Sequence, residues 1–174
     1  HQEYLGHDLS DIAAEKAGIL KPSAPVVVGR QPPAAARVIA ARAAALGITP
    51  YRQDDDWRVA EEGDGIVYRE PHWSIHLPRP GLAGPHQVDN AGMAVACARR
   101  LGTAVIPETA LAAGLTAVRW PARLQPLHPA GGHAGALSGL LPAGWELWLD
   151  GGHNPAAGAA LAAAVAAWPS RPLD

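Results

Sequence analysis

An alternation of helices and strands near the N-terminus constrains the fold of this chain more than any other feature. The run PVVVG, residues 25–29, contains three consecutive β-branched valines, as in strands that are buried on both faces of a parallel sheet. A helical segment precedes it, and a second helix begins after Pro32 and Pro33 and ends at Gly47. Another extended piece begins at Thr49. This order is typical of α/β folds, so we expect an α/β architecture.

The segments that follow predict a different local structure. Between residues 54 and 80, the runs GIVYRE and HWSIHLP alternate apolar and polar side chains, which favours a local antiparallel excursion. The stretch 81–102 begins as a Gly/Pro loop and becomes a helix, and 106–118 is a second helix with Pro107 near its start. The first of these helices is expected to turn six side chains inward: Val88, Ala91, Met93, Val95, Ala96 and Leu101.

Composition argues against several classes of protein. The 174 residues and the 48% apolar content suit a globular core, and a net charge of -2 with scattered basic residues offers no nucleic-acid surface. No signal peptide and no apolar run of about 18 residues support secretion or membrane insertion. The single cysteine, Cys97, excludes an internal disulfide and indicates a reducing cytoplasm; we expect it in the core.

Both ends of the sequence are expected to be truncated. The chain opens on His1 without an initiating methionine, and it closes on SRPLD directly after a helical run, where an α/β pattern normally continues into another strand. The Pro-interrupted stretch RWPARLQ, 119–125, is expected to be a domain junction. We therefore expect two incomplete units, residues 1–120 and 121–174.

Lysine is rare in this chain, so its positions are informative. Lys16 and Lys21 are the only lysines among 14 basic residues. An ammonium can lose its proton and then act as a nucleophile or be carbamylated, whereas a guanidinium stays protonated. Lys16 is expected in the last turn of a short helix that Asp8 or Ser10 caps and Gly18 ends. The alternative is an exposed surface lysine, which is our interpretation of Lys21.

Three further polar residues are candidates for a binding site. Asn90 is expected in the first turn of a helix, and its amide offers a donor and an acceptor that suit an adenine edge; a capping or solvated asparagine is the alternative. WELWLD, 145–150, is expected to be a strand that leads into a GGHNP turn and a helix, which places Asp150 and His153 at the carboxyl edge of a sheet. The alternative is an aspartate that caps the helix beside a passive histidine.

The sequence contains no familiar self-contained catalytic motif. It has no GxxxxGK[ST] phosphate loop, no HExxH, no CxxC pair and no GxSxG. A complete catalytic centre is therefore not visible within these residues.

Four ordered motifs carry a resemblance to a known family: HQEYLGHDLSDIAAEKAGILKP, LAGPHQVDNAGMAVACA, RWPARLQ and LDGGHNPAAGAAL. Together they span nearly the whole chain, which resembles the folylpolyglutamate synthase and dihydrofolate synthase family within the Mur-type ATP-dependent ligases. The resemblance implies the later part of a central ATPase domain followed by the start of a Rossmann-like C-terminal domain. It also implies an enzyme that activates a pteroate or folate carboxylate with ATP as an acyl phosphate, which the amino group of glutamate then attacks.

The resemblance implies roles for three residues of the N-terminal unit. His1 matches a histidine that binds Mg²⁺. Lys16 matches a lysine that is carbamylated, and a carbamate is an anionic oxygen ligand able to help position that ion. Asn90 matches an asparagine that contacts the adenine of ATP.

Three residues further along the chain match the opposite wall of the family's site. Arg123 matches an arginine that approaches the nucleotide from the hinge between domains, and Asp150 matches an aspartate that contacts ATP from the C-terminal domain. His153 is a catalytic candidate nearby with a less defined role. Phosphoryl transfer needs positioning and charge neutralisation more than covalent chemistry, and domain closure would exclude water from the acyl phosphate.

The sequence departs from the family pattern in several places. The family's phosphate loop and another magnesium ligand are expected upstream of His1, so the 174 residues alone should not catalyse the reaction. Ala122 stands where the family usually has glycine, and Gly152 where it usually has alanine. The stretch between Arg123 and Asp150 is longer than expected, which is consistent with an inserted loop.

Two competing interpretations remain open. A peptidoglycan Mur ligase performs the same chemistry on a nucleotide-sugar peptide, although AEKAGI and DGGHNP favour the folate branch. A non-catalytic nucleotide-binding or scaffolding protein that has lost the phosphate loop is the other. On the ligase interpretation we expect a cytoplasmic monomer that uses ATP, Mg²⁺, glutamate and a folate or dihydropteroate, and that binds neither nucleic acid nor membranes.

Overall fold

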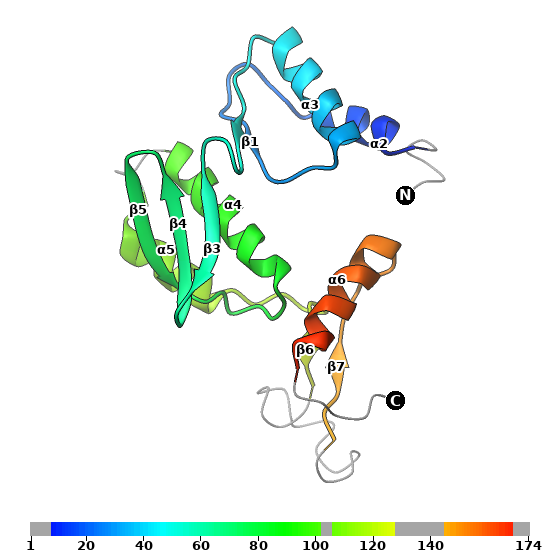
Figure 1. Ribbon diagram of the computed structural model, residues 1–174, viewed down its shortest axis with the longest axis vertical. Helices are drawn as coiled ribbons and strands as arrows, with labels where there is room; N and C mark the ends of the chain where they lie inside the picture. The colour runs from blue at the N-terminus through cyan, green and yellow to red at the C-terminus, as the bar shows by residue number, and fades with distance from the viewer. Residues whose placement is uncertain (1–7, 102–105, 128–144, 169–174) are drawn as a thin grey trace.

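The computed structural model describes residues 8–101, 106–127 and 145–168 (Figure 1). Its elements, in chain order, are α2 (Leu9–Ala17), β1 (Val27–Val28), α3 (Pro33–Ala45), β2 (Tyr51–Arg52), β3 (Arg58–Glu62), β4 (Gly65–Glu70), β5 (Trp73–Pro78), α4 (His86–Arg100), α5 (Glu108–Ala117), β6 (Gln125–Pro126), β7 (Trp148–Leu149) and α6 (Pro155–Ala166). None of the helices in the described ranges is long and apolar enough to cross a membrane.

The helix, strand, helix, strand order at the N-terminus is confirmed. β1 and β2 pair in parallel with Val27 opposite Tyr51, and α3 connects them and packs against α2. The expectation that PVVVG is buried on both faces was wrong, because only Val27 and Val28 form a strand and both are half-buried. In the described chain β1 has one strand partner, so the pair shields less surface than a full parallel sheet would.

Helix α2 forms as its sequence predicts. Asp8 is the N-cap, and its Oδ1 accepts hydrogen bonds from the backbone N–H groups of Ser10 (2.7 Å) and Asp11 (2.9 Å). Gly18 ends the helix in a right-handed conformation, with a φ of -58°. Lys16 therefore lies in the last turn, where a cation faces the negative end of the helix dipole, and its side chain is exposed.

The antiparallel segment between residues 54 and 80 contains three strands, one more than the sequence indicated. Strands β3, β4 and β5 form a meander in that order, and α4 packs against β3 and β4 while α5 packs against β5 (Figure 1). The sequence did not predict β3, because RVAEE has a single buried side chain, Val59, among exposed neighbours. A strand with so few apolar residues has no clear period-2 signal.

The hydrophobic core lies between this meander and α4. It contains Trp57, Val59, Ile66, Tyr68, Leu77, Ala91, Val95 and Ala96. The sequence has no phenylalanine, and two larger aromatic rings fill the centre: Trp57 and Tyr68 stack with their centroids 5.8 Å apart. Small residues of α4 face these rings, so the helix can approach the sheet closely.

Two residues of the segment 81–102 that we expected inside are at the surface. Cys97 is exposed, and Leu101, which follows the helix, is 67% exposed. Each helical step turns the side-chain direction by about 100°, so Cys97 points away from the face that carries Ala91 and Val95. Gln87, which is polar, is buried on that helix instead, with only 5% of its surface exposed.

Gly92 of α4 packs directly against the sheet and the ring of Trp57. A Cβ at this position would lie 2.7 Å from Val59 Cβ and 3.0 Å from Trp57 Cζ3. Gly92→Ala is therefore expected to lower the free energy of unfolding by about 1–3 kcal/mol through overpacking. Urea titration followed by tryptophan fluorescence measures the change.

Gly158 of α6 provides the matched control for that substitution. It is also inside a helix, but nothing lies within 4 Å of a Cβ built there, and the residue is exposed. Gly158→Ala should keep or raise stability by up to about 1 kcal/mol, since alanine is the better helix former. Equal effects of the two substitutions would contradict the close packing at Gly92.

The last described elements form a small unit beside the rest of the chain (Figure 1). We expected 145–150 to be one strand at the carboxyl edge of a sheet, but only Trp148–Leu149 is a strand, and it pairs antiparallel with β6. Helix α6 follows the GGHNP turn as predicted, and Trp148 contacts Trp168 with ring centroids 4.7 Å apart. The segment 128–144, interpreted as an inserted loop, lies outside the described residues.

Candidate functional site

Three of the residues singled out in the sequence line one cavity. Arg123, Asp150 and His153, together with His86 from the start of α4, border a space of about 220 Å³. The cavity lies at the N-terminal end of α6, where the unpaired N–H groups and the helix dipole favour a negative charge. The fold therefore brings the RWPARLQ and DGGHNP motifs together although 26 residues separate Leu124 from Asp150.

Asp150 connects these two motifs directly. Its Oδ2 accepts a hydrogen bond from the backbone N–H of Leu124 (2.9 Å), and its Oδ1 accepts one from Gly152 (2.7 Å). Leu124 has a φ of 42°, a left-handed conformation that is uncommon for a residue with a branched side chain. Asp150 thus stabilises a strained turn beside Arg123. It does not cap α6; that role belongs to Asn154, whose Oδ1 accepts from Ala157 N (2.9 Å).

The two departures from the family pattern have different structural consequences. Ala122 has a φ of 55°, a conformation that glycine adopts without strain, and the side chain of Gln125 and the N–H of Gly151 hold its backbone groups. A Cβ at Gly152 would lie 2.9 Å from both Asp150 Oδ1 and Ala157 Cβ. Ala122 therefore carries strain here, while Gly152 is the residue that fits the turn.

Arg123 is the available positive charge of this cavity. Its side chain is exposed, it donates a long hydrogen bond to the carbonyl of Ala122 (3.4 Å), and it forms no ion pair within the described ranges. His153 is held differently, since its Nδ1 lies 3.0 Å from the carbonyl oxygen of Gly151. Donation from Nδ1 to that oxygen would leave Nε2 as the acceptor of a neutral imidazole.

Asn90 lies in a second cavity, of about 310 Å³, bounded by α4, α5 and the Pro80–Leu82 loop. Its walls are mostly aliphatic, and Asn90 and Gln87 are their amide side chains. Apolar walls with a few placed polar groups are typical of sites for planar ligands. Asn90 is not the N-cap of α4, a position that Pro85 occupies, and its Nδ2 donates to Gln87 Oε1 at 2.9 Å.

A hydrogen-bonded pair that sequence reasoning missed connects the two cavities. Gln87 Nε2 lies 2.9 Å from His86 Nε2, so Gln87 joins His86 of the first cavity to Asn90 of the second. His86 Nδ1 is buried and has no hydrogen-bond partner in the part of the chain that the structure describes. In the sequence, His86 and Gln87 are visible only as adjacent polar residues in GPHQVDN. Nothing in that pattern indicates that the glutamine is buried.

The remaining predicted site residues are not brought to these cavities. Lys16 is exposed on α2, which packs against α3, and it lines neither cavity. His1 lies outside the described residues. Within the ranges described, no group of three or more His, Cys, Asp or Glu side chains could hold a metal ion.

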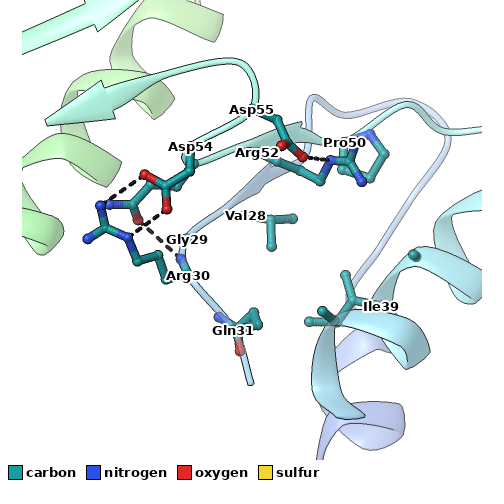
Figure 2. Close-up of a pocket in the computed structure, with 12 residues that line it drawn as sticks. Val28, Gly29, Arg30, Gln31, Ile39, Pro50, Arg52, Asp54 and Asp55 are labelled. Atoms are coloured by element: carbon teal, nitrogen blue, oxygen red, sulfur yellow. Dashed lines mark hydrogen bonds and ion pairs between the residues drawn. The ribbon is translucent and has the colours of Figure 1, made fainter. Parts of the chain in front are cut away.

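A third cavity, of about 390 Å³, lies beyond the carboxyl ends of β1 and β2 (Figure 2). Its charged side chains are engaged with one another: Arg30 donates to both oxygens of Asp54, at 2.6 and 2.9 Å, and also to Asp89 at 2.6 Å. The hydrogen bonds from Arg30 lower the pKa of Asp54. Since Asp89 precedes Asn90 on α4, this cluster anchors the start of that helix to the parallel pair.

Comparison with known proteins gives the family of the chain. A folylpolyglutamate synthase from Lacticaseibacillus casei is 31% identical in an alignment of 164 positions that covers 89% of this chain and 35% of that protein. A dihydrofolate synthase/folylpolyglutamate synthase from Mycobacterium tuberculosis is 30% identical over 95% of this chain and 34% of its own length. The chain belongs to the folylpolyglutamate synthase and dihydrofolate synthase family. It spans about a third of the length of these relatives.

The solved structure of an FPGS–AMPPCP–folate complex matches the fold with a TM-score of 0.79 at 30% identity, over 99% of this chain and 41% of that one. The α/β architecture related to Mur ligases is thereby confirmed. No family model matches the chain.

Proposed function

We propose that the protein containing this chain is an ATP-dependent ligase that adds L-glutamate to dihydropteroate or to a folate through an acyl phosphate. The observation that carries the proposal is the cavity shared by Arg123, Asp150 and His153, which is linked through His86 and Gln87 to the amide of Asn90. Membership of the family supports the reaction class.

Each wall of the proposed site has a distinct task. The aliphatic cavity would take the adenine ring, with Asn90 hydrogen-bonded to its edge. Arg123 and the N-terminal end of α6 would face the phosphates, where they stabilise the negative charge that develops during phosphoryl transfer. Asp150 acts mainly by holding the Leu124 turn, and with it Arg123, in place.

Lys16 would act from the opposite side of the ATP site as a carbamate, and its exposed position leaves its nitrogen accessible to dissolved CO₂. Mg²⁺ is expected from the resemblance, with His1 as one ligand. We place the two units at residues 1–120 and 121–174, so that RWPARLQ is the hinge. A cytoplasmic monomer remains our expectation.

Two alternatives make different predictions. A peptidoglycan Mur ligase would require a nucleotide-sugar peptide, and a non-catalytic module would bind nucleotide without turnover. The folate ligase is favoured because the relatives are folate enzymes at 30–31% identity. ATP-dependent incorporation of labelled glutamate by the protein that the complete gene encodes separates the three. Label should enter dihydropteroate, tetrahydrofolate or both; incorporation into neither would refute the proposal.

Asn90→Ala is expected to raise the KM for ATP about tenfold, with little change in the KM for the folate substrate. The reason is the loss of the amide that would pair with the adenine edge, worth about one neutral hydrogen bond. Steady-state kinetics with each substrate varied in turn measure both constants. An effect confined to the folate substrate would contradict the adenine assignment.

A further inference from the structure

Gln87 is a buried amide with both ends in use. Only 5% of its surface is exposed, its Oε1 accepts from Asn90 Nδ2 at 2.9 Å, and its Nε2 lies 2.9 Å from His86 Nε2. With the amide nitrogen of Gln87 toward the ring, His86 Nε2 accepts and the ring proton is on Nδ1, which has no partner among the described residues. In this arrangement the hydrogen bonds run from Asn90 to Gln87 to His86.

This direction determines what Asn90 presents to a ligand. One hydrogen of its Nδ2 is committed to Gln87, while its Oδ1 has no hydrogen-bond partner among the described residues. If the amide of Asn90 turned over, its Oδ1 would face Gln87 Oε1, and two acceptors would meet without a hydrogen between them. Asn90 is exposed, so without Gln87 its amide would be free to adopt either orientation.

Purine nucleotides differ at the position that such an amide reads. Adenine has an amino group at carbon 6, a donor, whereas hypoxanthine and guanine have a carbonyl there, an acceptor. With its orientation fixed, the Asn90 Oδ1 accepts a hydrogen bond from the 6-amino group of adenine and repels the 6-carbonyl oxygen of hypoxanthine or guanine. An amide that turns over freely can satisfy both, and then discriminates little between them.

We propose that Gln87 is a positioning residue that fixes the orientation of the Asn90 amide and thereby makes the site select 6-aminopurine over 6-oxopurine nucleotides. This inference rests on the proposed function, in which Asn90 contacts the base. Gln87 lines the same cavity as Asn90, and we assign its effect on base preference to its hydrogen bond with the Asn90 amide.

The test compares ATP with ITP, which replaces the 6-amino group by a carbonyl. Isothermal titration calorimetry on the protein encoded by the complete gene gives the Kd for each nucleotide. In Gln87→Leu the preference for ATP over ITP should fall about tenfold, through weaker ATP binding and equal or tighter ITP binding. Gln87→Met serves the same comparison if the leucine variant does not fold.

Two further variants separate positioning from general damage. Gln53 is similarly buried, at 7% exposed, and bonds to Arg30 and Asp89 without contacting Asn90, so Gln53→Leu should keep the wild-type preference. In Gln87→Glu the carboxylate still accepts from Asn90 Nδ2, so the preference should be retained. The inference is overturned if Gln53→Leu or Gln87→Glu loses as much of the preference for ATP over ITP as Gln87→Leu does.

Failure of the inference and failure of the proposed function give different results. If Gln87→Leu keeps the wild-type preference while Asn90→Ala weakens ATP binding, Asn90 contacts the base but Gln87 does not position it. If Asn90→Ala leaves the Kd for ATP unchanged, the adenine assignment itself is wrong and the inference falls with it.

Discussion

Arg123→Ala is expected to lower kcat/KM for ATP-dependent glutamate addition by about 10²–10³-fold, the usual effect of removing one preorganised group that stabilises transition-state charge. Arg123 has this position because the Leu124 turn, held by Asp150, places it in the cavity of His153 and the N-terminal end of α6. Its guanidinium forms no ion pair within the described residues, so it is available to a phosphate. Initial rates of glutamate incorporation measure the effect.

Two variants control for the loss of charge at Arg123. Arg42, exposed in the last turn of α3, lies in a different part of the chain, and Arg42→Ala should leave kcat/KM within about twofold. Arg123→Lys should recover part of the activity, because an ammonium keeps the charge but not the planar fork that binds two oxygens. Equal rates for Arg123→Ala and the wild type would remove Arg123 from the site.

Lys16→Arg is expected to reduce amide formation by about 10³-fold or more. Only an amine can lose its proton and react with CO₂ to form a carbamate, so arginine keeps the positive charge but cannot supply the anionic oxygens. The exposed side chain at the end of α2 makes no ion pair with other described residues, so no partner opposes the reaction. Turnover, and the ¹³C signal of a carbamate formed from labelled bicarbonate, are the two measurements.

Lys21 is the natural control for Lys16, because these are the only two lysines in the chain. It is exposed just beyond α2, and Lys21→Arg should retain both the turnover and the carbamate signal. If the signal persists in Lys16→Arg and disappears in Lys21→Arg, the assignment of the carbamate is wrong. Unchanged turnover of Lys16→Arg would refute a role for the carbamate even if the modification occurs.

Local structure was predictable where neighbouring residues in the sequence determine it. Asp8 and Gly18 bound α2 as their types indicate, and Gly47, with a φ of 66°, ends the segment after α3. The GIVYRE and HWSIHLP runs pair antiparallel, as their alternation predicted. Caps, turns and strand alternation act over a few residues, so their signals survive without knowledge of the fold.

Burial was less predictable, because it depends on which face another element covers. Cys97 and Leu101 look like core residues by type, yet the sheet packs against a different side of α4. Gln87 looks like a surface residue by type, yet it is buried because His86 and Asn90 satisfy both ends of its amide. A buried polar group is tolerated only with such partners, and these depend on the tertiary fold.

The sequence by itself determined the α/β class, the order of the four motifs and therefore the candidates Lys16, Asn90, Arg123, Asp150 and His153. Residue type and spacing carry this information, because chemistry and local turns need particular side chains at particular intervals. Only the tertiary structure decided how the candidates are grouped. It placed three of them in one cavity, used Oδ2 of Asp150 to hold the strained Leu124 turn, and joined His86 to Asn90 through Gln87. Contacts between segments far apart in the chain, and the orientation of a buried amide, depend on three-dimensional packing.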